Sequence, residues 1–422
     1  MLDLLLNAIP LLAFSATVTA GLSPRADHSL VAGAWYTGWH ATEGFPLSKV
    51  SWEKYNTLYY SFAITTPSVH ELSLDGSDPK LLPQFVSEAK KHKVSAQVAI
   101  GGWDGGRWFS SNMDSTGNRT AFVQTVVNFA EQYDLDGINF DWEYPNVQGI
   151  GCNTISPDDT SNFLAFLQEL RRNPVGAKLV LSAAVAVTPF VGPDGNPSTD
   201  VSGFADALDY IAIMNYDIWG LGSTAVGSTA VGPNAPLNDA CVAAADQIGS
   251  AVSAVKKWSA AGIPADKIVL GVASYGHSFS VPPMDAFVPG SKTQLMAYPA
   301  FNASNQPLGD AWDDTGSVDS CGVYEGPGGD WDFWGLIDGG FLTPQGMPAE
   351  GIYYRYDTCS QTPYVYNKTS EVMVSFDNAQ SFAAKGSYIK KAGLRGFAMW
   401  EAGGDRNDIL LNSIRSTAGL HK

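Results

Sequence analysis

The chain has 422 residues, of which 45% are hydrophobic and 16% are charged, and it carries a net charge of −17 at pH 7. This composition is typical of a folded globular protein and excludes an intrinsically disordered one. The excess of acidic residues excludes nucleic acid as a partner, because a protein that binds phosphates needs a basic patch. The length is greater than that of most single-core domains, but it suits an α/β barrel with an inserted module.

The first 20 residues are expected to be a signal peptide. Residues 4–20 are mostly apolar and end in the small-residue segment Val18–Ala20, which suits cleavage. The stretch is too short to span a bilayer once Asn7 and Pro10 are taken into account. The sequence therefore predicts a secreted, extracellular protein with no membrane partner. N-glycosylation sequons, which agree with secretion, lie at Asn118, Asn302 and Asn367.

Short apolar runs alternate with amphipathic stretches, which is the pattern of βα units around a parallel sheet. Strands are expected at Val31–Tyr36, Leu58–Ile64, Val94–Gly101, Gly137–Glu143, Leu179–Val187, Tyr210–Tyr216, Ile268–Tyr275 and Leu394–Trp400. Helices are expected at Leu82–His92, Thr120–Tyr133, Thr160–Arg172, Asn238–Ala261 and Ala379–Lys391. Asn118 and the segment Ser156–Asp159 are polar residues of the kind that precede helices. Eight strands alternating with helices predict a (β/α)8 TIM barrel.

The interval between the seventh and eighth expected strands is too long for a simple loop. It is rich in Gly, Pro, Asp and aromatic residues, and irregular connections of this length are uncommon unless they fold by themselves. We therefore expect an inserted α+β domain at residues 278–369. The barrel would then comprise residues 30–277 and 370–415, after a signal peptide at residues 1–20.

The chain has four cysteines, an even number that suits disulfide bonds in a secreted protein. Neither a CxxC spacing nor a histidine cluster suggests a metal site. Of the three possible pairings, we favour Cys152–Cys241 and Cys321–Cys359, because each bond then stays within one module.

The segment Asp136–Glu143 is the most informative part of the sequence. If it is a strand, its side chains alternate between two faces, so Asn139, Asp141 and Glu143 share one face while apolar residues occupy the other. Two carboxyl groups and an amide directed into one space must be paired or hydrogen-bonded. Such groupings are typical of catalytic sites, although networks of charges can also be purely structural.

Other distinctive residues fall at the carboxyl ends of the expected strands, where (β/α)8 enzymes have their active sites. These ends are Gly101–Trp103, Met214–Asp217 and Met399–Glu401. The convergence of several such ends predicts a single site that includes Asp141 and Glu143.

The segment Asp136–Glu143, followed by Tyr144-Pro145, resembles the DGxDxDxE strand of glycoside hydrolase family 18, the family of chitinases and chitinase-like lectins. The resemblance extends from about Ala32 to Asp405. The chain differs at Asn139, where the family has aspartate, at Ala99, where it usually has serine, and at His277, where it has arginine. The remaining matches are Tyr36, Phe62-Ala63, Ala99–Gly102, Met214–Asp217, Tyr275–Phe279 and Trp400.

This resemblance implies hydrolysis of β-1,4 bonds in chitin with retention of configuration, in which the substrate's own N-acetyl group is the nucleophile. Glu143 would be the general acid and base, Asp141 would orient the acetamido group, and Tyr216 would donate a hydrogen bond to it. An ionised Asp141 would raise the pKa of Glu143, which suggests an acidic to neutral optimum. The residues expected to contact the sugar are Tyr36, Phe62, Gly102, Trp103, Met214, Asp217 and Trp400. The resemblance implies no cofactor and no metal.

Asn139 is the departure with the clearest chemical consequence. An amide can donate a hydrogen bond to Asp141, as a protonated acid would, but it cannot release or take up a proton. We therefore expect an active enzyme with an altered pH profile. Ala99 removes a hydroxyl group from the same network.

Two other functions fit the same sequence. A chitinase-like lectin would bind the sugar without cleaving it, although Glu143, which such relatives usually lose, is present. An endo-β-N-acetylglucosaminidase would act on N-glycans, but the inserted domain favours a chitinase because it would deepen a cleft for a linear polymer. The expected partners are chitin or N-acetylglucosamine oligosaccharides, bound by a monomer.

Overall fold

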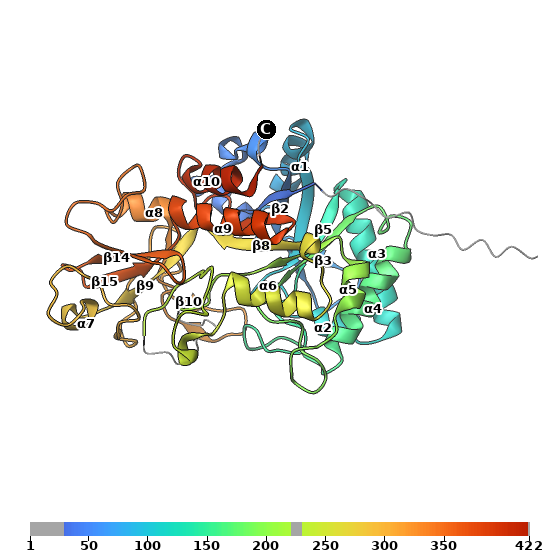
Figure 1. The fold of residues 1–422 in the computed structure, drawn as a ribbon. Coiled ribbons are helices and arrows are strands. Elements are labelled where there is room, and N and C mark those ends of the chain that lie inside the picture. The colour runs from blue at the N-terminus through green and yellow to red at the C-terminus, as the bar shows by residue number, and fades with distance from the viewer. Residues whose placement is uncertain (1–28, 221–229, 421–422) are drawn as a thin grey trace, which may run out of the picture.

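The computed structural model describes residues 29–220 and 230–420, and the expected signal peptide lies outside these residues (Figure 1). Within them, the backbone forms a closed parallel barrel, a ring of helices around it, and a second, antiparallel sheet beside one end of the barrel.

The barrel confirms the predicted (β/α)8 fold. Its parallel strands are β1 (Val31–Thr37), β2 (Thr57–Thr65), β4 (Ser95–Gly101), β5 (Gly137–Asp141), β6 (Val180–Val185), β7 (Tyr210–Ile213), β8 (Ile268–Ala273) and β16 (Gly396–Trp400). The strand β1 pairs with both β2 and β16, which closes the sheet on itself. A short strand, β3 (Leu72–Ser73), extends β2 outside the barrel.

The helices cover the outer surface of the barrel. They are α1 (Leu81–Lys91), α2 (Phe109–Met113), α3 (Thr116–Gln132), α4 (Asp159–Arg172), α5 (Ser202–Ala207), α6 (Ala251–Ala260), α9 (Ala379–Ala392) and α10 (Ile409–Ala418). Short 3₁₀ turns lie at Gly38–Ala41, Leu47–Lys49, Trp52–Lys54, Ala244–Asp246 and Ala265–Lys267.

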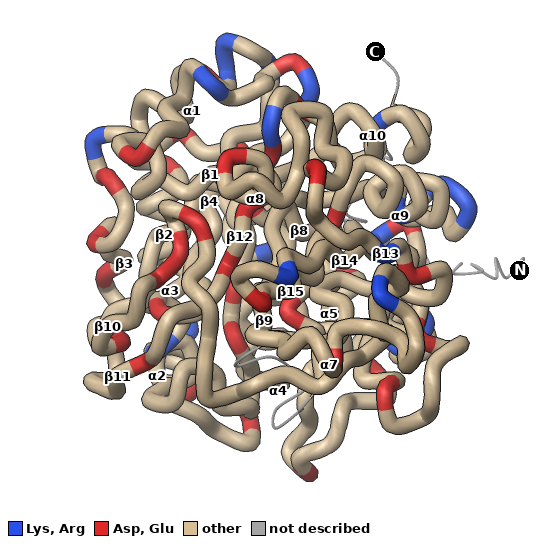
Figure 2. The backbone as a smooth tube through the Cα atoms, turned by 90° about the vertical axis from the view of Figure 1, so that its left-hand side faces the viewer, with Lys and Arg blue, Asp and Glu red and all other residues tan. Residues whose placement is uncertain are grey.

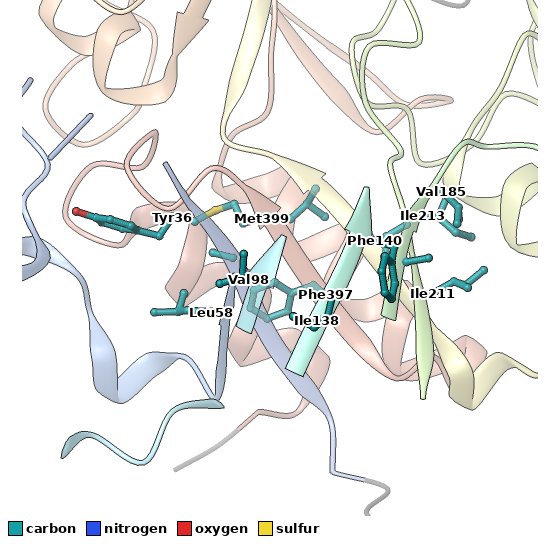
Figure 3. Packing of buried hydrophobic residues seen from close by; sticks show 14 of the residues in the cluster. Tyr36, Leu58, Val98, Ile138, Phe140, Val185, Ile211, Ile213, Phe397 and Met399 are labelled. Carbon is teal, nitrogen blue, oxygen red and sulfur yellow. The ribbon is translucent and has the colours of Figure 1, made fainter. Parts of the chain in front are cut away.

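Alternation along each strand separates two apolar layers. Ile138 and Phe140 of β5 point outward into the layer between strands and helices, which also contains Phe397 and Met399 of β16 (Figure 3). The inward residues of the strands form a separate layer inside the barrel, and Trp35 belongs to it. The inside of a small barrel is therefore filled with side chains and is not a channel.

Two expected helix starts were wrong. Helix α3 begins at Thr116, because the Ser115 side chain accepts a hydrogen bond from the backbone N–H of Asn118, so Asn118 lies inside the helix. The helix expected at Asn238–Ala261 forms only as α6, because Ser250 makes a capping box with Ser253 and begins the helix there.

The second sheet confirms that extra strands are inserted between β8 and β16. Its order is β12 (Asp330–Asp332), β9 (Tyr275–Ser280), β15 (Val372–Ser375), β14 (Thr362–Asn367) and β13 (Tyr353–Asp357), and all its pairings are antiparallel. The same interval of the chain also contains α7 (Pro283–Ala286), α8 (Phe333–Asp338) and a hairpin of β10 (Ser317–Val318) and β11 (Tyr324–Glu325). We call this unit, from β9 to β15, the inserted domain. The boundary expected at residue 278 falls within β9, and that expected at residue 369 precedes β15.

The disulfide pairing that we favoured was wrong. Cys152 is bonded to Cys321 and Cys241 is bonded to Cys359, with Cα–Cα distances of 5.6 Å and 5.8 Å. Each bond joins a loop of the barrel to the inserted domain, because the carboxyl-end loops of the barrel pack against that domain. Proximity along the chain could not show this packing.

None of the helices in residues 29–220 and 230–420 has both the length and the apolar character that crossing a bilayer requires.

A buried ion pair connects α9 to the turn that precedes it. The ammonium nitrogen Nζ of Lys385 lies 2.6 Å from Oδ1 of Asp377, and neither side chain is exposed to solvent. Removing one partner of such a pair leaves a buried charge without compensation.

We predict that Asp377→Ala destabilises the fold by about 3–5 kcal/mol, the usual cost of breaking a buried pair. Asp338→Ala is the matched control, because the ion pair of Asp338 with Arg406 is exposed and such pairs contribute about 0–1 kcal/mol. Urea unfolding of both variants measures the difference. Equal shifts of the two midpoints would contradict the prediction.

Candidate active site

The carboxyl end of β5 forms the centre of the site. The strand ends at Asp141, and the carbonyl oxygen of Asp141 accepts a hydrogen bond of 2.8 Å from the backbone N–H of Gly102 after β4. Asn139 and Asp141 are buried, and Glu143, just beyond the strand, is partly exposed. On the opposite face of the segment, Trp142 stacks on Phe109. The apolar face therefore anchors the segment that presents the carboxyl groups.

Asn139 is fixed by partners inside the barrel. Its side-chain N–H donates to Oγ of Ser182 at 2.9 Å, and its side-chain oxygen accepts from Nε1 of Trp35 at 3.3 Å. The expected hydrogen bond from Asn139 to Asp141 is not formed. Oδ1 of Asp141 is buried and has no hydrogen-bond partner among the described residues. Asn139 thus serves the barrel interior and leaves this oxygen of Asp141 without a partner.

Burial controls the protonation of the two carboxyl groups. It raises the pKa of Asp141 to about 7. Burial also raises the pKa of Glu143 well above its ordinary value, and the negative charge of Asp141 adds to this effect. A hydrogen bond with Tyr144 acts in the opposite direction without reversing it. The pair therefore holds at least one proton at neutral pH.

The hydroxyl group of Tyr216 lies among three carboxylates. Burial raises its pKa well above the ordinary value, and Asp141, Asp217 and Glu143 raise it further. Tyr216 therefore remains protonated and can donate a hydrogen bond. Its interaction with Asp141 and Glu143 also shows that the chain segment after β7 lies beside the end of β5.

Asp217 is held in place by three hydrogen-bonding partners. Its backbone has a φ of 54°, and its N–H donates to the side-chain oxygen of Asn234 at 2.8 Å. Its Oδ1 accepts a hydrogen bond of 2.5 Å from the hydroxyl group of Tyr275 and lies 2.8 Å from Nε2 of His277. Its side chain nevertheless remains 50% exposed, so it can also contact a ligand.

A row of stacked rings extends beside the carboxyl groups. Phe62 stacks on Trp400 with ring centroids 5.7 Å apart and on Trp39 with centroids 6.1 Å apart. Gly102 has a φ of 81°, and a Cβ there would approach the ring of Phe62 to 2.8 Å. The aromatic row thus explains why this position carries glycine. Trp103 is 41% exposed, which leaves its ring available to a ligand.

A network of polar side chains around Glu401 lies next to the aromatic row. Glu401, next to Trp400, is buried and accepts a hydrogen bond from the hydroxyl group of Thr37. Its Oε1 lies 3.0 Å from Nδ1 of His40, and the His40 ring stacks on Trp312 of the inserted domain at 3.8 Å. The inserted domain therefore contacts the barrel next to the site.

Of the expected sugar contacts, Tyr36 does not lie at the site, whereas Met214 does. Tyr36 is fully buried, stacks on Phe85 and donates its hydroxyl hydrogen to the carbonyl oxygen of Phe45 at 3.1 Å. It therefore belongs to the layer between strands and helices and does not join the site (Figure 3). Met214 is partly buried and packs against the apolar layer inside the barrel, as Phe62 and Trp400 do. Together with Trp400 it also packs against the cluster that contains Tyr216, so it stays at the site.

Sequence reasoning missed the residues that hold Asp217. Tyr275 and His277 lie in a segment that it had singled out, but no role was given to the histidine. Asn234 and Asp330, a second partner of His277, belong to no motif. Only the paired strands β9 and β12 bring Asp330 to His277, so no local pattern could have identified it.

A cavity of about 910 Å³ lies at the opposite end of the barrel, where Val31, Ser95 and Tyr210 begin their strands. Barrel chemistry takes place at the carboxyl end, so we assign this cavity no function. Figure 2 shows Asp and Glu positions spread over the side that carries the inserted domain, among uncharged residues and some Lys and Arg, and the chain as a whole has a net charge of −17. A neutral or cationic ligand suits it better than an anionic one.

The arrangement can therefore supply a protonated carboxyl group, an adjacent carboxylate, a hydroxyl donor and flat apolar rings. This combination suits proton transfer to a leaving group on a ligand with apolar faces, such as a sugar ring.

Comparison with known proteins agrees with this geometry. The family model for glycosyl hydrolases family 18 matches residues 32–405. A chitinase-like effector of Moniliophthora roreri is 49% identical over 99% of this chain and 100% of its own length. A chitinase-like effector of Moniliophthora perniciosa is 49% identical over 93% of this chain and 88% of its own. The crystal structure of a chitinase from Rhizomucor miehei is similar, with a TM-score of 0.80 and 32% identity over 92% of this chain and 99% of that one. The chain therefore belongs to glycosyl hydrolase family 18.

Proposed function

We propose that the protein binds N-acetylglucosamine oligosaccharides and hydrolyses their β-1,4 bonds with retention of configuration. The observation that carries the proposal is the pairing of buried Asp141 with partly exposed Glu143, in which burial and the negative charge of Asp141 raise the pKa of Glu143 well above its ordinary value. A general acid must be protonated when the leaving group departs, and this burial provides that state.

In the first step, the N-acetyl carbonyl oxygen of the substrate attacks the anomeric carbon as the glycosidic bond breaks. Glu143 gives its proton to the departing oxygen. The Asp141 carboxylate stabilises the positive charge that develops on the acetamido group, and Tyr216 donates a hydrogen bond to that group. In the second step, Glu143 takes a proton from water, which attacks the anomeric carbon and restores the acetamido group.

Phe62, Trp103 and Trp400 would hold the sugar rings by stacking, and Asp217 would accept a hydrogen bond from a sugar hydroxyl group. These roles fit the exposure of Trp103 and the half-exposed carboxylate of Asp217. We propose that a monomer performs this reaction outside the cell. The two disulfide bonds support an extracellular location, since such bonds persist in oxidising compartments.

Sugar binding without hydrolysis is the second candidate. Asn139 favours it, because position 139 then offers Asp141 no second acid with which to share a proton, and the amide bonds to Trp35 and Ser182 instead. The two Moniliophthora relatives named chitinase-like effectors make this alternative worth testing. Turnover of chitooligosaccharides decides between the two candidates. Parallel assays on N-glycans test the third possibility, an endo-β-N-acetylglucosaminidase.

We predict that Glu143→Gln lowers kcat by at least about 100-fold, the lower limit for loss of a general acid, and still binds the sugar. Release of a fluorophore from N-acetylchitooligosaccharide substrates measures turnover, and calorimetry measures binding. Glu131→Gln, the same change at an exposed position of α3, is the control and should leave both unchanged. A wild-type protein that binds but does not turn over would establish the second candidate.

The pH dependence follows from the raised pKa of Asp141. Asp141 must be ionised to stabilise the acetamido charge, so kcat/KM should fall as the pH drops through about 7. At higher pH the rate should fall again as Glu143 loses its proton, which gives a bell-shaped profile for the coupled pair. The optimum is thus expected at the neutral end of the acidic to neutral range, or above it. An acidic limb near pH 4 would contradict this prediction.

We predict that Asn139→Asp moves the acidic limb to lower pH by about 1 unit. A protonated carboxyl group there can donate a hydrogen bond to ionised Asp141 and so lower its pKa. Asn128→Asp, at an exposed position of α3, makes the same chemical change far from the site and serves as the control. An unchanged pH–rate curve for Asn139→Asp would show that this position does not control the protonation of the pair.

A further inference from the structure

His277 lies between two carboxylates that come from different parts of the fold. Its Nε2 is 2.8 Å from Oδ1 of Asp217, in the segment after β7. Its Nδ1 is 2.6 Å from Oδ1 of Asp330, on β12 of the inserted domain. Its side chain is only 11% exposed. The imidazole ring therefore links the site of the barrel directly to the inserted domain.

The strand register makes this arrangement unavoidable. In the antiparallel pair of β9 and β12, His277 lies directly opposite Asp330, and on the other side of β9 it pairs with Ser375 of β15. Gly220 packs on the ring, because a Cβ there would lie 2.9 Å from it. Cross-strand neighbours of opposite charge stabilise each other, so Asp330 fixes the ring and the ring faces Asp217.

Both ring nitrogens face carboxylate oxygens, which accept hydrogen bonds and cannot donate them when ionised. A ring that carries hydrogen on both nitrogens, and is therefore a cation, suits both carboxylates. Burial alone would lower the pKa of His277, but Asp330 and Asp217 together raise it to about 10. Tyr275, on the same strand as His277, donates its hydroxyl hydrogen to the same oxygen of Asp217. Other titratable groups act electrostatically on the two carboxylates: Glu143, Tyr144 and Tyr216 on Asp217, and Asp310, Asp313 and Asp332 on Asp330.

We propose that His277 is a positioning residue that fixes the carboxylate of Asp217 for sugar binding and that Asp330 of the inserted domain sets its orientation. The inference rests on the proposed function, because it assigns Asp217 to the sugar. The proposal goes further in one respect. The inserted domain would influence the affinity for the sugar through the ion-paired imidazole of His277, in addition to any part of the cleft that it lines.

The test compares four variants of the full-length protein for binding of N-acetylchitotetraose by calorimetry at pH 7. His277→Gln should weaken binding by about 10-fold or more, because a hydrogen bond to a charged group is lost. His277→Arg keeps the charge and several donors, so it should stay within about 3-fold of wild type. Asp330→Asn should weaken binding less than His277→Gln. The double variant His277→Gln/Asp330→Asn should be no weaker than His277→Gln, because Asp330 acts through the ring.

His70→Gln, at an exposed position, is the matched control and should bind as wild type does. Nitrogen-15 spectra of the imidazole groups supply a readout that altered folding would not mimic. His277 should stay doubly protonated beyond pH 8 in wild type and should titrate at lower pH in Asp330→Asn.

Different outcomes separate this proposal from the proposed function. Equal loss of binding in His277→Arg and His277→Gln, additive effects in the double variant, or a neutral His277 at pH 7 would overturn the positioning role. Wild-type protein that binds the tetrasaccharide without cleaving it would refute hydrolysis alone, and the comparison of variants would still decide the role of His277. Wild-type protein that does not bind the sugar would overturn both proposals.

Discussion

The burial of two neighbouring carboxyl groups is the constraint on which the rest of the site depends. Asp141 and Glu143 cannot both be ionised cheaply in the mouth of the barrel, because each charge loses its hydration and they repel each other. The apolar anchor of Trp142 on Phe109 and the backbone bond from Gly102 hold the segment in place despite that cost. Because the fold tolerates this electrostatic cost at the end of β5, the pair of carboxyl groups retains a proton at neutral pH.

Features that depend on the local alternation of apolar and polar residues could be predicted from the sequence. The alternation from Ile138 to Glu143 separated the inward from the outward residues of β5, and the number of apolar runs gave the barrel. Features that depend on contacts between distant segments could not. Tyr36 lies in a strand as expected, although the strand continues to Thr37. Its side chain points away from the site, since a shift of one residue reverses the face. The disulfide partners and the contact of Asp330 with His277 follow only from how the inserted domain packs on the barrel.

Asn139 affects both the hydrogen bonding inside the barrel and the protonation of Asp141. In the structure its amide completes the hydrogen bonding of Trp35 and Ser182, which fill the inside of the barrel. A carboxyl group at this position would have to be protonated to make the same bond to Ser182. With asparagine at position 139, Trp35 and Ser182 keep their hydrogen bonds at every pH, but this residue cannot exchange a proton with Asp141. Burial is then the main cause of the raised pKa of Asp141.

Both disulfide bonds have a further consequence for how this protein can be altered. Cys152 and Cys241 lie in the barrel portion, whereas Cys321 and Cys359 lie in the inserted domain. Trp312 adds a third attachment by stacking on His40 and donating a hydrogen bond to the carbonyl oxygen of Glu43. The domain is thus not a cassette that can be excised or transplanted. Its removal would leave Cys152 and Cys241 without their partners, and a chimera would need matched cysteines on both sides of the junction.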